Sequence, residues 1–145
     1  MTVLGVVFTF HLIGLVIWLG AAFLLPIVIL PAARSLEGAA PNAFLGALTR
    51  RYLPWFVGGG LVVGLTGWIQ TEMMIDDLNL TAAYTKHFVI LPLIAVSAYI
   101  WFYLARKLGK PGADAKLWNQ MAVWAWVQAA LAVAVLAITG WLTGA

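Results

Sequence analysis

Cysteine is absent from the 145-residue chain, and this absence excludes several kinds of site at once. Without thiols the protein cannot attach a prosthetic group through Cys-x-x-Cys-His, bind metal through thiolates or form disulfides. Charged residues are scarce as well, at 9% of the chain, whereas soluble domains contain roughly 25%. Neither a Walker loop nor an H-E-x-x-H motif occurs in the sequence. The chain therefore carries no recognisable motif for nucleotide hydrolysis or for a zinc protease.

Apolar residues make up 64% of the chain and are concentrated in four long runs. A helix needs roughly 20 predominantly apolar residues to cross a bilayer. The runs that meet this requirement are residues 3–30, 52–74, 82–104 and 118–141. We therefore predict an all-α fold, an integral membrane four-helix bundle that forms a single domain over residues 1–145. The first run has no Lys or Arg before it and no small-residue cleavage site after it, so we expect a retained helix.

The basic residues are distributed unevenly between the connecting segments. Residues 31–51 and 105–117, predicted to be loops on one side, contain seven of the eight Lys and Arg residues. The segment 75–81 and its flanks on the other side are acidic, with Lys86 as the single cation. Because basic loops stay in the cytoplasm, we predict a multi-pass protein of the bacterial inner membrane with both termini outside (N-out/C-out). The net charge of +3 follows from this arrangement and gives no indication of nucleic-acid binding.

Histidine occurs at two positions, His11 and His87, and each lies inside a predicted span. With the termini outside, His11 lies about eight residues, or roughly 12 Å, below the outer surface, and His87 lies about five residues below it. Ionisable side chains are costly in lipid and usually mark a functional site. Two imidazoles from different helices at similar depth predict a shared metal ion or haem. Lys86, beside His87, is expected to form charge-assisted hydrogen bonds with haem propionates, or to pair with nearby acids.

Small residues follow one face of the second span. Gly60, Gly64 and Gly67 are spaced by four and three residues. Such residues either let a neighbouring helix approach closely or leave a slot for a flat macrocycle, and the sequence leaves both alternatives open. Trp18 follows His11 by two turns on the same helix face, so we predict that it lines the interior of the bundle.

Two other groups of side chains are expected to have structural roles. The tryptophans are expected mainly to form aromatic belts, with Trp55, Trp101 and Trp118 near the cytoplasmic boundary of the predicted spans and Trp68 and Trp141 nearer the outer one. Gln128 lies in the middle of the fourth span and is expected to make a hydrogen bond between helices.

Short motifs in three of the spans resemble those of known membrane protein families. The run His11–Pro26, with Trp18 within it, resembles the opening helix of the copper-resistance D-type proteins and is similar to that of the HemJ-type protoporphyrinogen oxidases. The stretches Arg50–Gly67 and Tyr84–His87 resemble the following helices of the same families. The resemblance implies a four-helix membrane bundle, haem b or copper, and a redox or metal-handling role. The oxidases typically have Arg after the proline, and here Ile27 stands at that position.

Three classes of function remain open. The first is a membrane b-type haem protein, an oxidoreductase or electron-transfer subunit, with His11 and His87 as axial ligands and a quinone or redox protein as partner. The second is a copper-handling protein in which Met73 and Met74 join the histidines, since thioethers and imidazoles suit Cu(I). The third is a structural subunit of a respiratory complex. The resemblance adds a HemJ-like oxidase, and either a homodimer or a complex subunit fits the bilayer-embedded chain.

Overall fold

The computed structural model describes residues 2–73, 80–110 and 114–144, and every element in these ranges is helical. In chain order the elements are α1 (Val3–Leu24), η1 (Leu25–Ile29), α2 (Leu30–Arg34), α3 (Ala40–Met73), α4 (Leu80–Ala98), η3 (Tyr99–Leu104), α5 (Ala105–Leu108) and α6 (Ala115–Gly144). The two η elements are π-helical turns within otherwise α-helical segments. Four segments are long and apolar enough to cross a membrane, and the predicted all-α fold with four spans is thereby confirmed.

The helices extend beyond the predicted spans at one end of the bundle. The first helical segment continues to Arg34, and α3 begins at Ala40, so the prediction that residues 31–51 form a loop is wrong for most of that stretch. The predicted loop 105–117 is shortened in the same way by α5 and by the start of α6. Hydropathy reports the length of helix that suits lipid. It does not report where backbone hydrogen bonding ends, and a helix that projects into water can carry charged residues.

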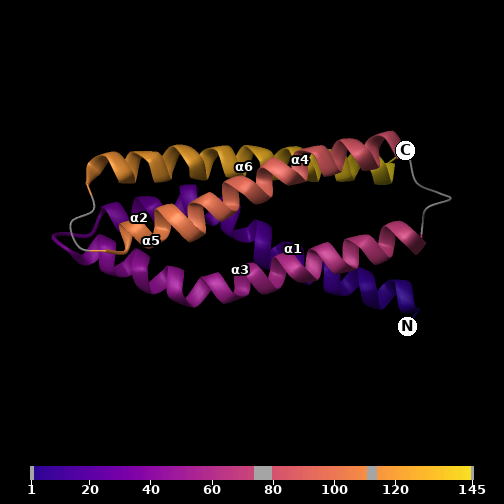
Figure 1. Cartoon of the computed structure of the whole chain (residues 1–145), viewed down its shortest axis with the longest axis horizontal. Helices are drawn as coiled ribbons and strands as arrows, with labels where there is room; N and C mark the ends of the chain where they lie inside the picture. Colours follow the sequence, from indigo (N-terminus) through magenta and orange to yellow (C-terminus); the bar gives the residue numbers. More distant parts are fainter. Residues whose placement is uncertain (1, 74–79, 111–113, 145) are drawn as a thin grey trace.

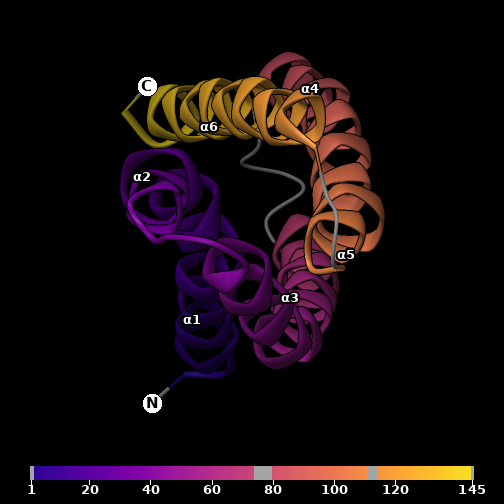
Figure 2. The ribbon, with the colours of Figure 1, turned by 90° about the vertical axis from the view of Figure 1, so that its left-hand side faces the viewer.

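The long helices are arranged as two hairpins. α1 packs mainly against α3, and α4 packs mainly against α6. Both termini lie at the same end of the molecule (Figure 1). We call this the terminal end, and we call the opposite end, which carries Arg34 and Leu108, the basic end. Seen end-on, the helices surround a central region (Figure 2). The hairpins contact one another largely through η1 and α5 at the basic end, and α1 also touches α6.

Close packing between α1 and α3 depends on Gly14 and Gly59, which no sequence pattern singles out. A Cβ added at Gly14 would lie 2.9 Å from a methyl carbon of Val63 and 3.1 Å from the carbonyl oxygen of Gly59. Only glycine permits backbones to approach this closely. Nearby, the hydroxyl of Tyr52 donates a hydrogen bond to the carbonyl oxygen of Ile17 over 2.6 Å. Together these contacts fix the register of α1 against α3.

An aromatic cluster fills the interior between the hairpins. The ring of Trp101 lies 4.7 Å from that of Tyr52 and 6.3 Å from that of Phe56, and Phe56 lies 6.3 Å from Trp18, measured between centroids. Trp101 is 1% exposed, so the prediction that it belongs to an aromatic belt is wrong. It lies within η3, where the wider π-helical turn alters the direction of side chains. Its position near the end of the span, on which the belt prediction rested, does not indicate which way the side chain faces.

Polar side chains add specific bonds between helices. Nε2 of Gln128 donates to Oγ of Ser97 over 2.8 Å, and both side chains are buried, so the interhelical hydrogen bond predicted for Gln128 is confirmed. At the basic end, the guanidinium of Arg34 donates to the carbonyl oxygen of Trp118 over 3.1 Å. Nε1 of Trp118 in turn donates to Oδ1 of Asn42 over 3.2 Å. These bonds join both hairpins at the basic end.

Candidate functional site

A cavity of about 700 Å³ lies between the two hairpins. This volume falls within the roughly 300–1,000 Å³ that is usual for small-molecule and cofactor sites. The cavity is lined by residues of α1, α3, α4 and α6 and by one residue of η3. All of the site residues predicted from the sequence are among them: His11, Trp18, Gly64, Gly67, Lys86 and His87. The fold thus brings the six residues together, and their role in binding stays a prediction.

The cavity is long, and its polar groups are concentrated toward the terminal end. Its lining on α3 runs from Phe56 to Glu72, a distance of roughly 24 Å at the rise of an α-helix. The wall is apolar over most of this length, and the polar residues that line it beside the histidines are Thr71, Glu72, Lys86 and Thr139. A ligand with an apolar body and one polar edge matches this distribution.

His11 projects from α1 and is held in place by α3. Nδ1 of its ring lies 2.9 Å from Oγ1 of Thr66. The hydroxyl of Thr66 also lies 2.5 Å from the carbonyl oxygen of Val62, one turn earlier on α3. The ring edge passes close to Gly67, where an added Cβ would lie 3.3 Å from Cε1 of His11. Half-buried and bonded on one side, the imidazole has a defined orientation at the cavity wall.

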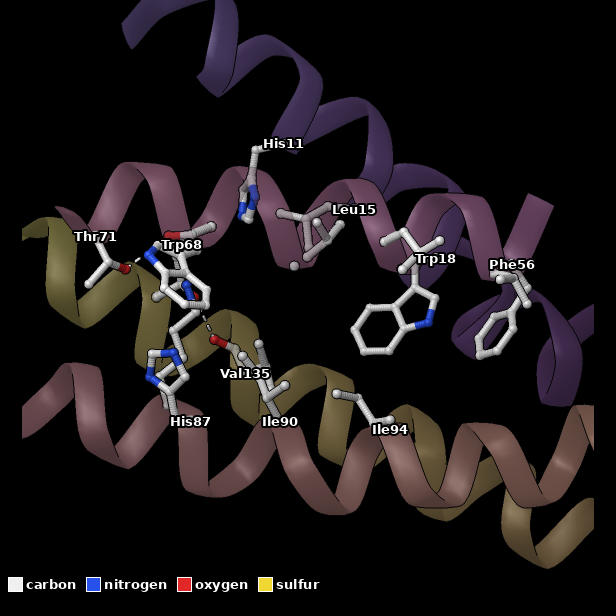
Figure 3. A pocket seen from close by; sticks show the side chains of 18 of the residues that line it. His11, Leu15, Trp18, Phe56, Trp68, Thr71, His87, Ile90, Ile94 and Val135 are labelled. Carbon is white, nitrogen blue, oxygen red and sulfur yellow. Dashed lines mark hydrogen bonds between the residues drawn. The ribbon is translucent and has the colours of Figure 1, made fainter. Parts of the chain in front are cut away.

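His87 lies on the other side of the cavity. Figure 3 shows the rings of His11 and His87 projecting toward one another, one from α1 and the other from α4. Trp68 of α3 is drawn between the two rings in the same view and also lines the cavity. Both histidines thus line one cavity, and their depth in a membrane stays a prediction.

The glycines of α3 have different surroundings. A Cβ at Gly60 would meet the indole of Trp18 at 3.5 Å, and one at Gly67 would meet His11 as described above. A Cβ at Gly64 would meet nothing within 4 Å. The close contact between α1 and α3 is made instead at Gly14. The sequence left two alternatives open, packing against a neighbouring helix or an open slot. Gly60 and Gly67 pack against side chains of α1, whereas Gly64 faces open space.

The protein ligands available for a metal ion are few. Within residues 2–73, 80–110 and 114–144, no group of three or more His, Cys, Asp or Glu side chains is arranged to hold a metal ion. Met73, expected to assist copper binding, does not line the cavity, and Met74 lies outside the described residues. The possible metal ligands that line the cavity are therefore the imidazoles of His11 and His87 and the carboxylate of Glu72.

Sequence reasoning missed two parts of the site. Thr66 was not singled out, because a threonine in an apolar helix ordinarily bonds to the carbonyl four residues before it and nothing in the sequence marks a second partner. The contribution of α6, through Val135, Leu136 and Thr139, was also missed. These residues carry no distinguishing pattern, and only the packing of the second hairpin brings them to the cavity.

A comparison of the chain with family models, with curated proteins and with solved structures gave no match. The resemblance to the copper-resistance D-type and HemJ-type proteins therefore stays a prediction based on short motifs. The function has to be inferred from the cavity and from the chemistry of the residues that line it.

Proposed function

We propose that the protein is a membrane b-type haem protein that carries electrons, as an electron-transfer subunit or an oxidoreductase. The observation that carries this proposal is the placement of His11 and His87 on opposite walls of one apolar cavity. Neutral imidazoles are the usual axial ligands of such sites and tolerate burial better than charged groups. Bound between them, a haem would supply one-electron redox chemistry.

The residues of the cavity fit a flat apolar group with an anionic edge. Gly64 lines the cavity on α3, and the space in front of it would be reduced by any side chain at this position. Trp18 and Phe56 provide apolar surface deeper in the cavity and exclude water from it. Lys86 lies at the polar part of the cavity, next to His87, where its ammonium can form charge-assisted hydrogen bonds with carboxylates.

We also propose an orientation for the chain in the bacterial inner membrane. The basic end carries Arg34, Arg50, Arg106 and their basic neighbours, and such residues favour the cytoplasmic side. Both termini and the polar part of the cavity would then face outside. Electrons would be exchanged with a quinone or a redox protein near that outer face, within reach of the polar part of the cavity.

The visible spectrum of the purified protein tests the proposed function directly. We expect an absorption band of low-spin ferric haem that sharpens and shifts on reduction, with haem and chain in comparable amounts by pyridine haemochrome assay. A colourless preparation with stoichiometric copper would instead favour the copper-handling alternative. A preparation that takes up neither haem nor copper, although it is folded and monodisperse, would favour a structural subunit.

Neutralising the cation beside the second histidine should change the redox potential. Lys86→Gln is expected to lower the potential, because a positive charge near the iron favours the reduced state. It should also weaken haem binding about tenfold, since a hydrogen bond to a charged group contributes roughly 1.5–3 kcal/mol and Lys86 is only partly buried. Potentiometric titration and haem titration measure the two effects.

Lys116→Gln provides the matched control for Lys86→Gln. Lys116 is exposed, lies at the start of α6 and does not line the cavity, and its replacement removes the same charge from the chain. We expect this variant to keep the potential and affinity of the parent. If Lys86→Gln behaves like Lys116→Gln, the ammonium of Lys86 interacts with the acidic residues near the terminal end and not with the bound group.

A further inference from the structure

The hydrogen bonds around Thr66 specify which nitrogen of His11 carries the proton. The hydroxyl of Thr66 has a single hydrogen and two close neighbours, Nδ1 of His11 at 2.9 Å and the carbonyl oxygen of Val62 at 2.5 Å. Two oxygens at 2.5 Å repel one another unless a hydrogen lies between them, and a carbonyl has none to give. The hydrogen of Thr66 is therefore committed to Val62.

The commitment of that hydrogen leaves the oxygen of Thr66 as an acceptor toward the ring. A contact of 2.9 Å between this oxygen and Nδ1 of His11 is a hydrogen bond only if the proton lies on Nδ1. The carbonyl oxygen of Val63, at 3.4 Å from the Thr66 hydroxyl, is a much weaker alternative partner for its hydrogen. In a neutral imidazole with the proton on Nδ1, the lone pair is on Nε2.

The second contact of the ring with α3 supports the same orientation. Cε1 of His11, the carbon between its two nitrogens, lies against Gly67, at 3.3 Å from the position that a Cβ would take. A larger residue at Gly67 would displace the ring from Thr66. Thr66 and Gly67 thus hold one edge of the imidazole, and α3 controls the orientation of a side chain that α1 supplies.

We propose that Thr66 is a positioning residue for His11: it accepts the Nδ1 proton and thereby keeps the Nε2 lone pair available for a ligand in the cavity. The proposal rests on the proposed function in so far as Nε2 is the atom that binds the iron. Histidines that bind metals generally donate their other N–H to a neighbouring group, which fixes the tautomer and raises the basicity of the ligand. The hydroxyl of Thr66 would have this role, and no sequence motif indicated it.

Nitrogen NMR of ¹⁵N-histidine-labelled protein tests the tautomer without any bound haem. In the His87→Ala background His11 is the only imidazole of the chain, so its two nitrogen signals can be assigned without ambiguity. We expect a protonated Nδ1 and an unprotonated Nε2 in this full-length protein. Thr66→Val removes the hydroxyl acceptor with little change in shape, and the fraction of rings that carry the proton on Nε2 should rise, although the backbone of Val63 still contacts the ring. Thr66→Ser retains the hydroxyl and should preserve the parent pattern.

Haem titration of the same substitutions in the two-histidine protein gives a second result. Thr66→Val should weaken haem binding about 10- to 100-fold, the loss usual when a neighbour of a metal ligand is removed. Thr66→Ser should bind nearly as well as the parent. Thermal unfolding midpoints, measured without haem, serve to check that both variants are folded.

The two measurements separate this proposal from the proposed function. A proton on Nε2 in the parent, or a tautomer ratio in Thr66→Val equal to that of the parent, overturns the role of Thr66 whatever the protein binds. If the tautomers are as expected but the protein never takes up haem, Thr66 places the proton of His11 and haem is not the ligand. A Thr66→Val variant with the expected tautomer and unchanged haem affinity overturns the positioning role.

Discussion

Replacing either histidine with alanine will eliminate the low-spin haem spectrum. His11→Ala and His87→Ala each remove one of the two imidazoles that face the cavity from opposite walls. Affinity should fall by more than the roughly 10- to 100-fold that loss of a hydrogen-bonded neighbour of a metal ligand costs. Haem content per chain and the absorption spectrum of the reduced protein measure the loss.

Two controls make the interpretation of the histidine variants specific. Thr85→Ala changes an exposed residue two positions before His87 that does not line the cavity, and it should retain the parent spectrum. Imidazole added to His87→Ala should restore a low-spin spectrum, because the substitution leaves room for the free ring. A low-spin spectrum that persists in His87→Ala without imidazole would mean that another residue supplies the second ligand.

Filling the open slot in α3 will also block binding, without removing any ligand. In Gly64→Leu the side chain extends from a position where a Cβ meets nothing within 4 Å, on the wall of the cavity. We expect haem content to fall more than tenfold, a loss of about 1.4 kcal/mol or more in binding free energy. Stability of the haem-free protein should be unchanged or higher, because glycine is less favourable than alanine in a helix by roughly 0.8–1.0 kcal/mol and leucine ranks close to alanine.

Gly58→Leu is the matched control for this experiment. A Cβ at Gly58 also meets nothing within 4 Å, but Gly58 does not line the cavity. The same residue is thus introduced into the same helix, and only the surroundings differ. Haem binding should survive in Gly58→Leu. If Gly64→Leu retains full haem content as well, the bound group does not occupy the cavity between the hairpins.

The parts of the structure that the sequence predicted follow from length and helical rise. Apolar runs of sufficient length predict four spans, and the number of residues from the helix end predicts the depth of His11 and His87. Depth alone does not place the histidines near one another; both line one cavity because the hairpins α1–α3 and α4–α6 enclose it. Gln128 was predicted correctly because a polar amide in lipid requires a partner.

The parts that the sequence did not predict depend on the rotation of each helix and on three-dimensional contacts. Trp101 lies near the end of its span, and only the packing of the helices shows that its ring is buried. Gly14 is one of fourteen glycines, and only its distance to α3 distinguishes it as a packing residue. Thr66 is an ordinary helix threonine until His11 is placed beside it.

The arrangement of the hairpins would allow a group bound in the cavity to link them. The hairpins meet largely at the basic end, whereas His11 on α1 and His87 on α4 face one another toward the terminal end. A group held by both side chains would tie the halves together where the chain itself joins them least. Ligand at 100 times its dissociation constant adds roughly 2.7 kcal/mol to the cost of unfolding. Amide hydrogen exchange in the turns of α1 and α4 near the terminal end would then slow most. Occupancy of the cavity would thereby limit how far the two hairpins move independently.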